Sequence, residues 1–543
     1  MTFKNKLAES GVIKKRWHGR RSVAVVFPDS YGLGMANLGF QRIYELLNQN
    51  EDIVAERFFC NKTPTDTRSL ESNRHLSEFD IILLSVSFEM SYLNIAPFLL
   101  HAGIPLFSKD RTDEHPLVMA GGVACQINPC PAEAFVDAFI LGDFEAIHAK
   151  FEEFVLGNEL LSSSRENSLA KLVEAVDGIY CPILNKNSMV RPVIHTTSVS
   201  SVPHTVIVSN RSSFPNTFLL EITRGCGRGC RFCAAGFVYR PSRNWPEESI
   251  EQTISDTKGA KKIGLVGLEY ASASFISEFS SRLLDEGYQL GFSSLRADSL
   301  TDEFVTLLVR SKNFTATIAP EAGSERLRRV INKNLTEEQI LSAAETFARA
   351  GLKNLKLYFM MGLPYEDYED IEEIARLAIK VREVMLGYAK GRGKMGSVIV
   401  SVSTFVPKAW TPFQWAAFED VEVLKRKRNI LKNRLARVPN IKLRLDSVES
   451  ALLQAVLSRG DKSLGVLLST LVSKGYGNKR MVKEISQIAE NYLKEKGSKE
   501  EFPWEVVNHR VKRDYLLAQW RKAQRAEQTS FCNQKICRRC GAC

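Results

Sequence analysis

The sequence predicts an α/β protein with two parallel-sheet domains followed by a mainly helical region. Apolar strand-like segments alternate with amphipathic helical segments up to about residue 205, and the same alternation resumes beyond it. A chain of 543 residues is also too long for a single core. We therefore expect three regions, at residues 1–205, 206–440 and 441–543.

The first region carries continuous apolar strands, which are typical of a parallel sheet covered by helices on both faces. The segments are, in order, SVAVVFPD, ANLGFQRIYELLNQ, IVAERFF, DIILLSVSF, PLVMAGG, DAFILGD and EAIHAKFEEFVLG. We interpret this region as a doubly wound, flavodoxin-like domain that ends in a connector without clear periodicity. Ligands of such sheets bind at the carboxyl ends of the strands.

Small and polar residues lie at these strand ends. They are Asp29 to Gly34, Ser85 to Phe88, and the pair Gly121 and Gly122. Taken singly, each could be a tight turn, because glycine is needed wherever the backbone turns sharply. Together they are candidates for a ligand site.

The second region repeats a strand-then-helix pattern six times. Its strands are expected at TFLLEIT, KIGLVGL, QLGFSSL, FTATIAP, LKLYFMMG and SVIVSVSTFV. Six parallel strands with crossover helices predict a partial or full α/β barrel, whose active site lies at the strand carboxyl ends.

A cysteine loop, RGCGRGCRFC, directly follows the first strand of this predicted barrel and so opens into its mouth. It holds Cys226, Cys230 and Cys233 in a C-x3-C-x2-C array. A closed zinc site needs four protein ligands, but His204 precedes the loop by a strand and His509 is remote. A cubic iron–sulfur cluster on three thiolates instead leaves one iron open to a substrate or cofactor.

With the aromatic Phe232 before its last cysteine, this array resembles the signature of the radical S-adenosylmethionine (radical SAM) superfamily. The resemblance implies a partial (β/α)6 barrel and a [4Fe–4S] cluster whose open iron chelates SAM. Electron transfer from the cluster would cleave SAM to methionine and a 5′-deoxyadenosyl radical. It also implies an electron donor, namely a reductase, a flavodoxin or a ferredoxin.

Three further barrel segments are similar to those of the family. TIAPEAGSERLRRVINKNLT resembles the fourth-strand segment, and its Glu321 and Ser324 suit the ribose or aminoacyl group of SAM. LYFMMGLPYED resembles the G-x-P segment that lies against adenine, here with Gly362. GLEYAS departs from the family's G-G-E-like turn but offers Gly267 and Glu269 for the SAM amino group.

The first region resembles the cobalamin-binding (B12-binding) domain that precedes many radical SAM barrels. The matching positions are Asp29, Tyr31 and Gly34 in place of D-x-H-x-x-G, then Ser85 or Ser87, then Gly121 and Gly122. Tyrosine is a poor cobalt ligand beside imidazole. Two alternatives follow: cobalamin binds without a protein nitrogen on cobalt, or the domain keeps the fold without the ligand.

The closing C-x4-C-x2-C-x2-C run resembles a ferredoxin-like cysteine array more than a zinc ribbon. It consists of Cys532, Cys537, Cys540 and Cys543. We expect a second iron–sulfur cluster here, with structural zinc as the alternative. The scattered cysteines are interpreted as buried small apolar residues: Cys60, Cys125, Cys130 and Cys181.

The net charge of +11 is concentrated in residues 424–444 and 509–525. Leu424, Leu431 and Leu435 recur at near-helical spacing, which favours solvated faces of amphipathic helices over a nucleic-acid site. The sequence shows no apolar signal segment and no membrane span, so a cytoplasmic location is expected.

These observations predict a radical SAM enzyme that modifies an unactivated C–H position, with cobalamin-dependent methyl transfer or a rearrangement as the chemistry. An RNA-modifying radical SAM enzyme is an alternative, because of the basic carboxyl-terminal region. A non-catalytic iron–sulfur electron carrier or assembly factor is another, although it leaves the nucleoside-like pocket unexplained. The sequence does not specify the substrate.

Overall fold

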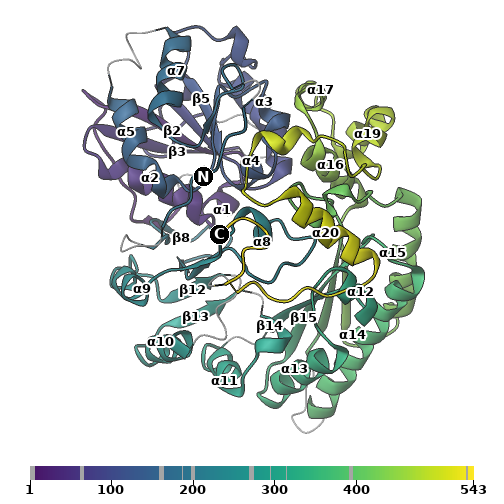
Figure 1. Ribbon diagram of the computed structural model, residues 1–543. Helices are drawn as coiled ribbons and strands as arrows, with labels where there is room; N and C mark the ends of the chain where they lie inside the picture. Colours follow the sequence, from purple (N-terminus) through teal and green to yellow (C-terminus); the bar gives the residue numbers. More distant parts are fainter. Residues whose placement is uncertain are drawn as a thin grey trace.

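The computed structural model describes residues 7–543 apart from a few short segments. The segments left out are 61–66, 158–163, 186–187, 197–201, 268–273, 294, 313–314, 390–395 and 534–535. Figure 1 shows the amino-terminal sheet domain above a barrel, with the last helices lying beside both. The predicted fold class is therefore confirmed.

The amino-terminal domain is a six-stranded sheet in the order β3-β2-β4-β5-β6-β7, with only β7 antiparallel. Its strands are β2 (Arg21–Phe27), β3 (Ile53–Phe59), β4 (Ile81–Ser85), β5 (Leu117–Gly121), β6 (Ala138–Ile140) and β7 (Ile179–Tyr180). Counted within the domain, the first five strands follow the flavodoxin-like order 2-1-3-4-5. Its helices are α1 (Tyr31–Gly34), α2 (Leu38–Gln49), α3 (Tyr92–His101), α4 (Val123–Ile127), α5 (His148–Leu156) and α7 (Arg165–Ala175).

The strands of this sheet are buried on both faces. In β2, Val23 and Val25 join one apolar cluster while Ala24 and Val26 join another. Side chains alternate across a strand, so two clusters from one strand require a layer of packing on each side. This is why the sequence shows continuous apolar runs rather than alternating ones.

Within the described residues, the barrel has seven parallel strands in two hydrogen-bonded groups, β13-β12-β9 and β14-β15-β16-β17. A bridge between Leu295 and Ile318 links the groups. The strands are β9 (Thr217–Glu221), β12 (Lys262–Val266), β13 (Gln289–Phe292), β14 (Thr315–Glu321), β15 (Asn354–Met361), β16 (Val398–Thr404) and β17 (Ile441–Leu445). All six expected strands are present, and β17 adds a seventh.

Helices follow the barrel strands. They are α8 (Ala235–Val238), α9 (Glu247–Ile254), α10 (Ser274–Asp285), α11 (Asp302–Arg310), α12 (Glu325–Val330), α13 (Glu337–Arg349), α14 (Tyr368–Ala389) and α15 (Val421–Leu435). Most of them cover the outside of the barrel, whereas α8 and α12 pack against the carboxyl-terminal region. Two short pairs complete the sheets: β1 (Glu9–Ser10) with β8 (Val208–Ser209), and β10 (Thr223–Arg224) with β11 (Arg243–Asn244). In β15 buried residues alternate with less buried ones, because the buried side chains face the helices and the others face the barrel interior.

The basic stretch at residues 424–444 forms the amphipathic helix α15 and strand β17. Leu424, Leu431 and Leu435 are buried against the barrel, as their spacing predicts. No described helix is long and apolar enough to cross a membrane. The four scattered cysteines are all buried, which confirms their interpretation as core residues.

The carboxyl-terminal region connects the two domains. Its helices are α16 (Val448–Arg459), α17 (Lys462–Ser473), α18 (Asn478–Glu484), α19 (Ser486–Leu493) and α20 (Arg513–Gln524). Helix α17 packs against α3 of the amino-terminal domain, as Figure 1 shows. The Asn128 amide of that domain donates to the Gly460 carbonyl at 2.8 Å. The two domains are thus held at a fixed distance by a third element.

Gly465 of α17 packs directly against the amino-terminal domain. We predict that Gly465→Ala lowers the free energy of unfolding by about 2 kcal/mol through overpacking. A Cβ at this position would lie 1.8 Å from the Pro131 carbonyl oxygen. The effect opposes the usual gain of about 0.5–1 kcal/mol when alanine replaces glycine within a helix. Thermal or urea unfolding measures the change.

Gly387 is the matched control, because it also lies within a helix but a Cβ there would meet no described atom within 4 Å. Gly387→Ala should raise stability. Equal effects of the two substitutions would contradict the assigned packing of α17.

Candidate active site between the two domains

A cavity of about 430 Å³ lies where the carboxyl ends of the amino-terminal strands face the mouth of the barrel. Ser85, Gly121 and Gly122 line it from the sheet domain, and Gly225 and Gly267 line it from the barrel. The cavity wall is largely apolar. Two strand-end surfaces, both of which are expected ligand sites, therefore meet at one space.

Several predicted residues lie in this wall: Ser85, Ser87, Gly121, Gly122 and Gly267. The backbone of Gly122 has φ +99°, and a Cβ there would lie 2.5 Å from the Val86 carbonyl oxygen. The absence of a side chain is thus a packing requirement as well as a source of space. Ser87 accepts a hydrogen bond from Asn37 Nδ2 at 2.9 Å.

The segment from Asp29 to Gly34 does not reach the cavity. The Tyr31 hydroxyl is buried and donates to Glu9 Oε1, and it also contacts Ser209 Oγ, both at 2.6 Å. Burial and the neighbouring Glu9 carboxylate raise the Tyr31 pKa. A Cβ on Gly34 would lie 2.4 Å from the Phe59 ring. Tyr31 and Gly34 therefore pack into the core of the domain in this structure.

The cysteine loop begins at the cavity wall. Gly225 has φ +85°, a backbone conformation that favours glycine, and it immediately precedes Cys226. The Cys226 sulfur accepts from the Arg228 N–H at 3.5 Å. Burial raises the pKa of Cys233 to about 12, the thiols of Cys230 and Cys226 add to the rise, and Lys333 opposes it.

Three thiols that influence one another electrostatically form a donor set suited to the corners of a cubic cluster. Among the described residues, no group of three or more Cys, His, Asp or Glu side chains could hold a single metal ion. The thiolates on a cubane bind separate irons, so the two arrangements differ. Phe232 packs beside the loop against a neighbouring apolar cluster.

Of the predicted SAM contacts, Gly267 lines the cavity, whereas Glu321, Ser324 and Gly362 lie outside its lining. Glu321 ends β14 with φ +69°, and its carboxylate accepts from Lys333 Nζ at 3.3 Å. Burial raises the Glu321 pKa, whereas Lys333 lowers it. Ser324 caps α12, where its hydroxyl accepts from Leu327 N–H at 3.0 Å and also contacts Asp370.

Gly362 has φ +79° and donates its N–H to Glu366 Oε1 at 2.7 Å, which holds the G-x-P turn in shape. Glu269 lies outside the described residues. Sequence analysis did not single out Lys333. The signal available was a lysine in the segment after the fourth strand, but its position beside Cys233 and Glu321 depends on the fold.

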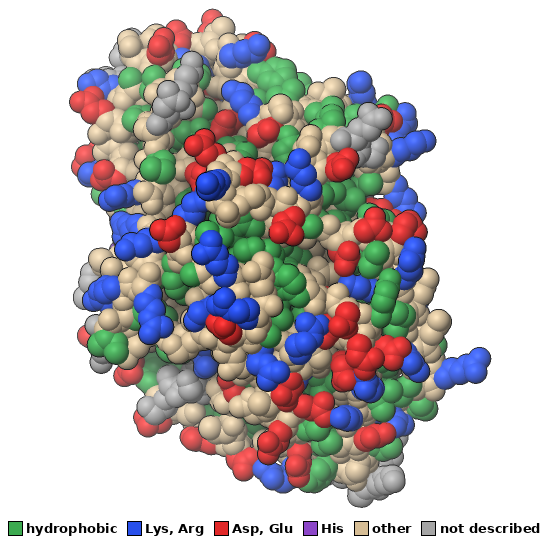
Figure 2. All heavy atoms as spheres, turned by 45° about the vertical axis from the view of Figure 1, so that its right-hand side comes forward, with side chains coloured by type: hydrophobic (Ala, Val, Ile, Leu, Met, Phe, Trp, Pro, Cys, Tyr) green, Lys and Arg blue, Asp and Glu red, His purple; other side chains and the backbone are tan. Residues whose placement is uncertain are grey.

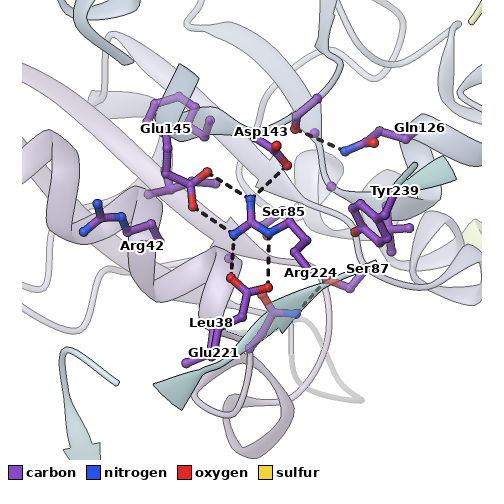
Figure 3. Close-up of a pocket in the computed structure, with 18 of the residues that line it drawn as sticks. Leu38, Arg42, Ser85, Ser87, Gln126, Asp143, Glu145, Glu221, Arg224 and Tyr239 are labelled. Atoms are coloured by element: carbon purple, nitrogen blue, oxygen red, sulfur yellow. Dashed lines mark hydrogen bonds and ion pairs between the residues drawn. The ribbon is translucent and has the colours of Figure 1, made fainter. Parts of the chain in front are cut away.

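Arg224 is the second residue that sequence analysis missed. It lies at the centre of the view in Figure 3, where its guanidinium contacts three carboxylates. Nη1 donates to Asp143 Oδ1 at 2.9 Å, and Nη2 donates to Glu145 Oε1 at 3.0 Å and to Glu221 Oε2 at 2.8 Å. Asp143 and Glu145 follow β6 of the sheet domain, whereas Glu221 ends β9 of the barrel.

This network holds the sheet domain against the residues that precede the cysteine loop. Burial alone would raise the Glu145 pKa, but the charge and hydrogen bonds of Arg224 lower it to about 2. Arg243 also contacts Asp143, at 3.1 Å. The segment LGDFEA did carry a signal, because two acidic residues, Asp143 and Glu145, follow a buried strand there. Their partner, Arg224, lies about 80 residues further along the chain.

The carboxyl-terminal tail lies against the outer side of the cysteine loop. Cys532 N–H donates to the Gly227 carbonyl at 3.0 Å. A second cavity of about 280 Å³ lies between them, and its wall includes Cys532, Cys537 and Cys540. Burial raises the Cys532 pKa, Arg240 opposes the rise, and the other three tail thiols add to it. The four tail cysteines are therefore grouped in the fold as well as in the sequence.

The comparisons with known proteins agree on one class of protein. Residues 39–182 match the family described as radical SAM proteins, N-terminal, and residues 220–378 match the radical SAM superfamily. An uncharacterised protein of Methanocaldococcus jannaschii is 28% identical over 454 residues, covering 82% of this chain and 90% of that protein.

Two further similarities are partial or distant. An uncharacterised methyltransferase of Pyrococcus horikoshii is 24% identical over 167 residues, which cover 29% of this chain and 36% of that protein. A solved structure of the radical SAM methyltransferase TsrM from Kitasatospora setae, with tryptophan and a SAM analogue bound, covers 86% of this chain and all of that chain at 11% identity, with a TM-score of 0.48.

The fold and the three-cysteine loop define a barrel enzyme that carries an iron–sulfur cluster and uses SAM. The two family matches together span more than half of the chain. The protein belongs to the radical SAM superfamily, as its sequence motif predicts. Its family implies a [4Fe–4S] cluster, SAM as cofactor and a reducing electron donor.

We predict that Arg224→Gln lowers stability at pH 7 by about 3 kcal/mol, because it leaves buried carboxylates without their partner. The lowered Glu145 pKa stabilises the fold above its ordinary value near 4.5, and this contribution is lost as the pH falls toward about 2. The difference in thermal midpoint between the natural protein and the variant should therefore be largest at pH 7 and smaller at pH 3.

Arg282→Gln is the control, since Arg282 makes an exposed ion pair with Glu251. Exposed pairs contribute little to stability. A pH-independent difference for Arg224→Gln would contradict the role assigned to the network.

Proposed function

We propose that this enzyme cleaves SAM reductively at a [4Fe–4S] cluster held by Cys226, Cys230 and Cys233, and that it methylates an unactivated carbon with cobalamin as the methyl carrier. The observation that supports the proposal is the cavity shared by the sheet domain and the barrel mouth. Gly225 lines this cavity one residue before the first cysteine of the loop. A ligand over the sheet would therefore lie beside the cluster.

The barrel residues would hold the cluster and SAM. The three thiolates would leave one iron open for the amino and carboxylate groups of SAM. Lys333 donates to the Glu321 carboxylate, and its positive charge also lowers the pKa of the Cys233 thiol. Gly362 shapes the G-x-P turn, because a Cβ there would lie 2.9 Å from Leu424 Cδ2 of α15 and a larger residue would push the turn away.

The sheet domain would hold cobalamin, which when bound supplies a transferable methyl group. Gly121, Gly122 and Ser85 form a cradle of small residues at the strand ends. Among the lining residues that the structure describes, none is a histidine. Since Tyr31 is engaged in the core, these residues fit a corrin without a protein nitrogen on cobalt.

The similarity to a protein named as a methyltransferase supports the choice of methyl transfer over rearrangement. That similarity covers less than a third of this chain, so it bears on the reaction class and not on the substrate. The largely apolar cavity wall favours a substrate with an apolar reacting carbon.

The first prediction from this proposal concerns SAM cleavage. Anaerobically reconstituted protein, reduced with dithionite in the presence of SAM, should release 5′-deoxyadenosine, detected by chromatography. Replacing Cys226, Cys230 and Cys233 together by alanine should reduce release to background, because no cluster then forms at the loop. Cys181→Ala, a buried cysteine of the sheet domain, is the control and should retain cleavage. Unchanged release from the triple variant would refute the assignment.

The second prediction concerns cobalamin. Protein purified without oxygen from cobalamin-fed cells should show corrin absorbance, and Ser87→Leu should abolish it by filling the cavity. Gly121→Leu should do the same, although a Cβ there also comes within 3.2 Å of the Ile140 carbonyl oxygen. The spectrum should be unchanged in His75→Ala and His101→Ala, because neither histidine lines the cavity.

Ser77→Leu is the matched control, since Ser77 is exposed and lies outside this cavity. It should keep the corrin. The absence of corrin in the natural protein, even after reconstitution, would remove methyl transfer and leave a radical rearrangement or oxidation.

A further inference from the structure

The cysteine loop has two faces, and each borders a different cavity. Gly225 lines the interdomain cavity, where SAM chemistry is proposed. Gly227, Arg228 and Gly229 line the tail cavity on the other side. The group held by the loop would therefore be approachable from a reaction side and from a tail side.

Hydrogen bonds from backbone and side-chain groups hold the tail against the loop. Cys532 N–H donates to the Gly227 carbonyl at 3.0 Å, and the Arg231 guanidinium donates to the Glu527 carbonyl at 2.6 Å. Asn332 connects both segments, because its Nδ2 donates to the Gly229 carbonyl at 3.1 Å and its Oδ1 accepts from Thr529 N–H at 2.8 Å. One hydrogen bond and one residue thus separate Cys532 from Cys226.

The surface around the tail is basic. Between residues 510 and 543 the exposed cations include Arg510, Lys512, Arg521, Arg525, Arg538 and Arg539, whereas the described acids are Asp514 and Glu527. Lys512 N–H donates to the Cys540 carbonyl at 2.8 Å, so this charge lies beside the tail cysteines. Figure 2 shows Lys and Arg side chains, with some Asp and Glu among them, across the middle of the face that it presents.

We propose that the tail is the site where electrons enter the enzyme: an acidic one-electron carrier protein docks on this basic surface and reduces an iron–sulfur cluster held by the tail cysteines, which passes the electron to the loop cluster. The proposal rests on the proposed function. It separates the reductant from the reaction cavity, because described tail residues line the second cavity and none of them lines the interdomain cavity.

The electrons balance in a simple sequence. A reduced carrier of the flavodoxin or ferredoxin class would lose one electron, and clusters held by the tail cysteines and by the loop cysteines would pass it on to SAM. SAM consumes that electron as its sulfur–carbon bond breaks, giving methionine and the 5′-deoxyadenosyl radical. Each SAM cleaved oxidises one carrier by one electron.

The structure favours a protein partner over RNA at this surface. Nonspecific RNA sites combine cations with aromatic side chains on which bases stack. Residues 526–543 contain a single aromatic side chain, Phe531, which faces the Arg228 guanidinium at 5.1 Å, so the cations there are not accompanied by a row of stacking rings. Charge complementarity with an acidic carrier raises the association rate and makes it sensitive to salt.

The test compares two routes of reduction in the full-length reconstituted protein. A purified flavodoxin, reduced by its NADPH-dependent reductase, serves as the protein donor, and dithionite serves as the small one. Lys512→Glu combined with Arg539→Glu should weaken flavodoxin binding in calorimetric titration by about tenfold and slow cluster bleaching by flavodoxin to a similar extent. Dithionite-driven bleaching and SAM cleavage should be unchanged.

The matched control reverses two exposed charges on α15, as Lys425→Glu with Arg426→Glu. This variant carries the same change in net charge on a different element. It should leave flavodoxin affinity and the rate of bleaching unchanged. Equal losses in both variants, or no loss in the tail variant, would overturn the proposed docking site.

A second variant tests the relay. Cys537→Ala with Cys540→Ala should slow flavodoxin-driven reduction of the loop cluster at least tenfold, while dithionite still reduces it. In the variant that lacks the three loop cysteines, about four irons per chain should remain in the tail. Zinc in their place would overturn the relay.

The remaining outcomes are also decisive. RNA that copurifies with the natural protein and is lost only from the tail variant, with flavodoxin affinity unchanged, would overturn the proposal in favour of an RNA surface. Absence of SAM cleavage with dithionite would refute the proposed function, whereas flavodoxin binding, measured separately, still reports on the docking site.

Discussion

The buried ion network at Arg224 is the contact on which the arrangement of this protein depends. One guanidinium is held by Asp143 and Glu145 from the sheet domain and by Glu221 from the barrel. Buried charges are costly unless they are paired. The network therefore stabilises the arrangement in which the two domains bring these four side chains together. The same residue precedes the cysteine loop, so the contact that joins the domains also sets the loop at the cavity wall.

The carboxyl-terminal region reinforces this arrangement from the opposite side. Helix α17 packs so closely that Gly465 has no room for a side chain, and buried His509 contacts the Gln126 carbonyl at 2.6 Å. Further along the chain the tail lies on the cysteine loop through Cys532. The carboxyl-terminal region, which the sequence predicts only as mainly helical, therefore contacts both domains. It also brings its own tail cysteines to the cysteine loop.

Much of the fold could be predicted because burial leaves a local signature. Continuous apolar strands indicated the two-sided sheet, and the spacing of Leu424, Leu431 and Leu435 indicated the buried face of α15. Strand β17 was missed, since IKLRL alternates apolar and basic residues within a stretch dominated by charge. The sequence could not show that the Asp29 to Gly34 segment lies outside the cavity lining, because the contact of Tyr31 with Glu9 depends on the tertiary fold.

By itself the sequence determined the α/β class, the three-cysteine loop at the end of the first barrel strand and the grouping of the tail cysteines, because each depends on residues close together in the chain. Only the tertiary structure decided that Arg224 meets Asp143 and Glu145, that Lys333 lies beside Cys233, and that the tail lies on the outer face of the loop. These contacts join residues distant in sequence. Local pattern carries no information on which of many possible partners the packing of domains brings together.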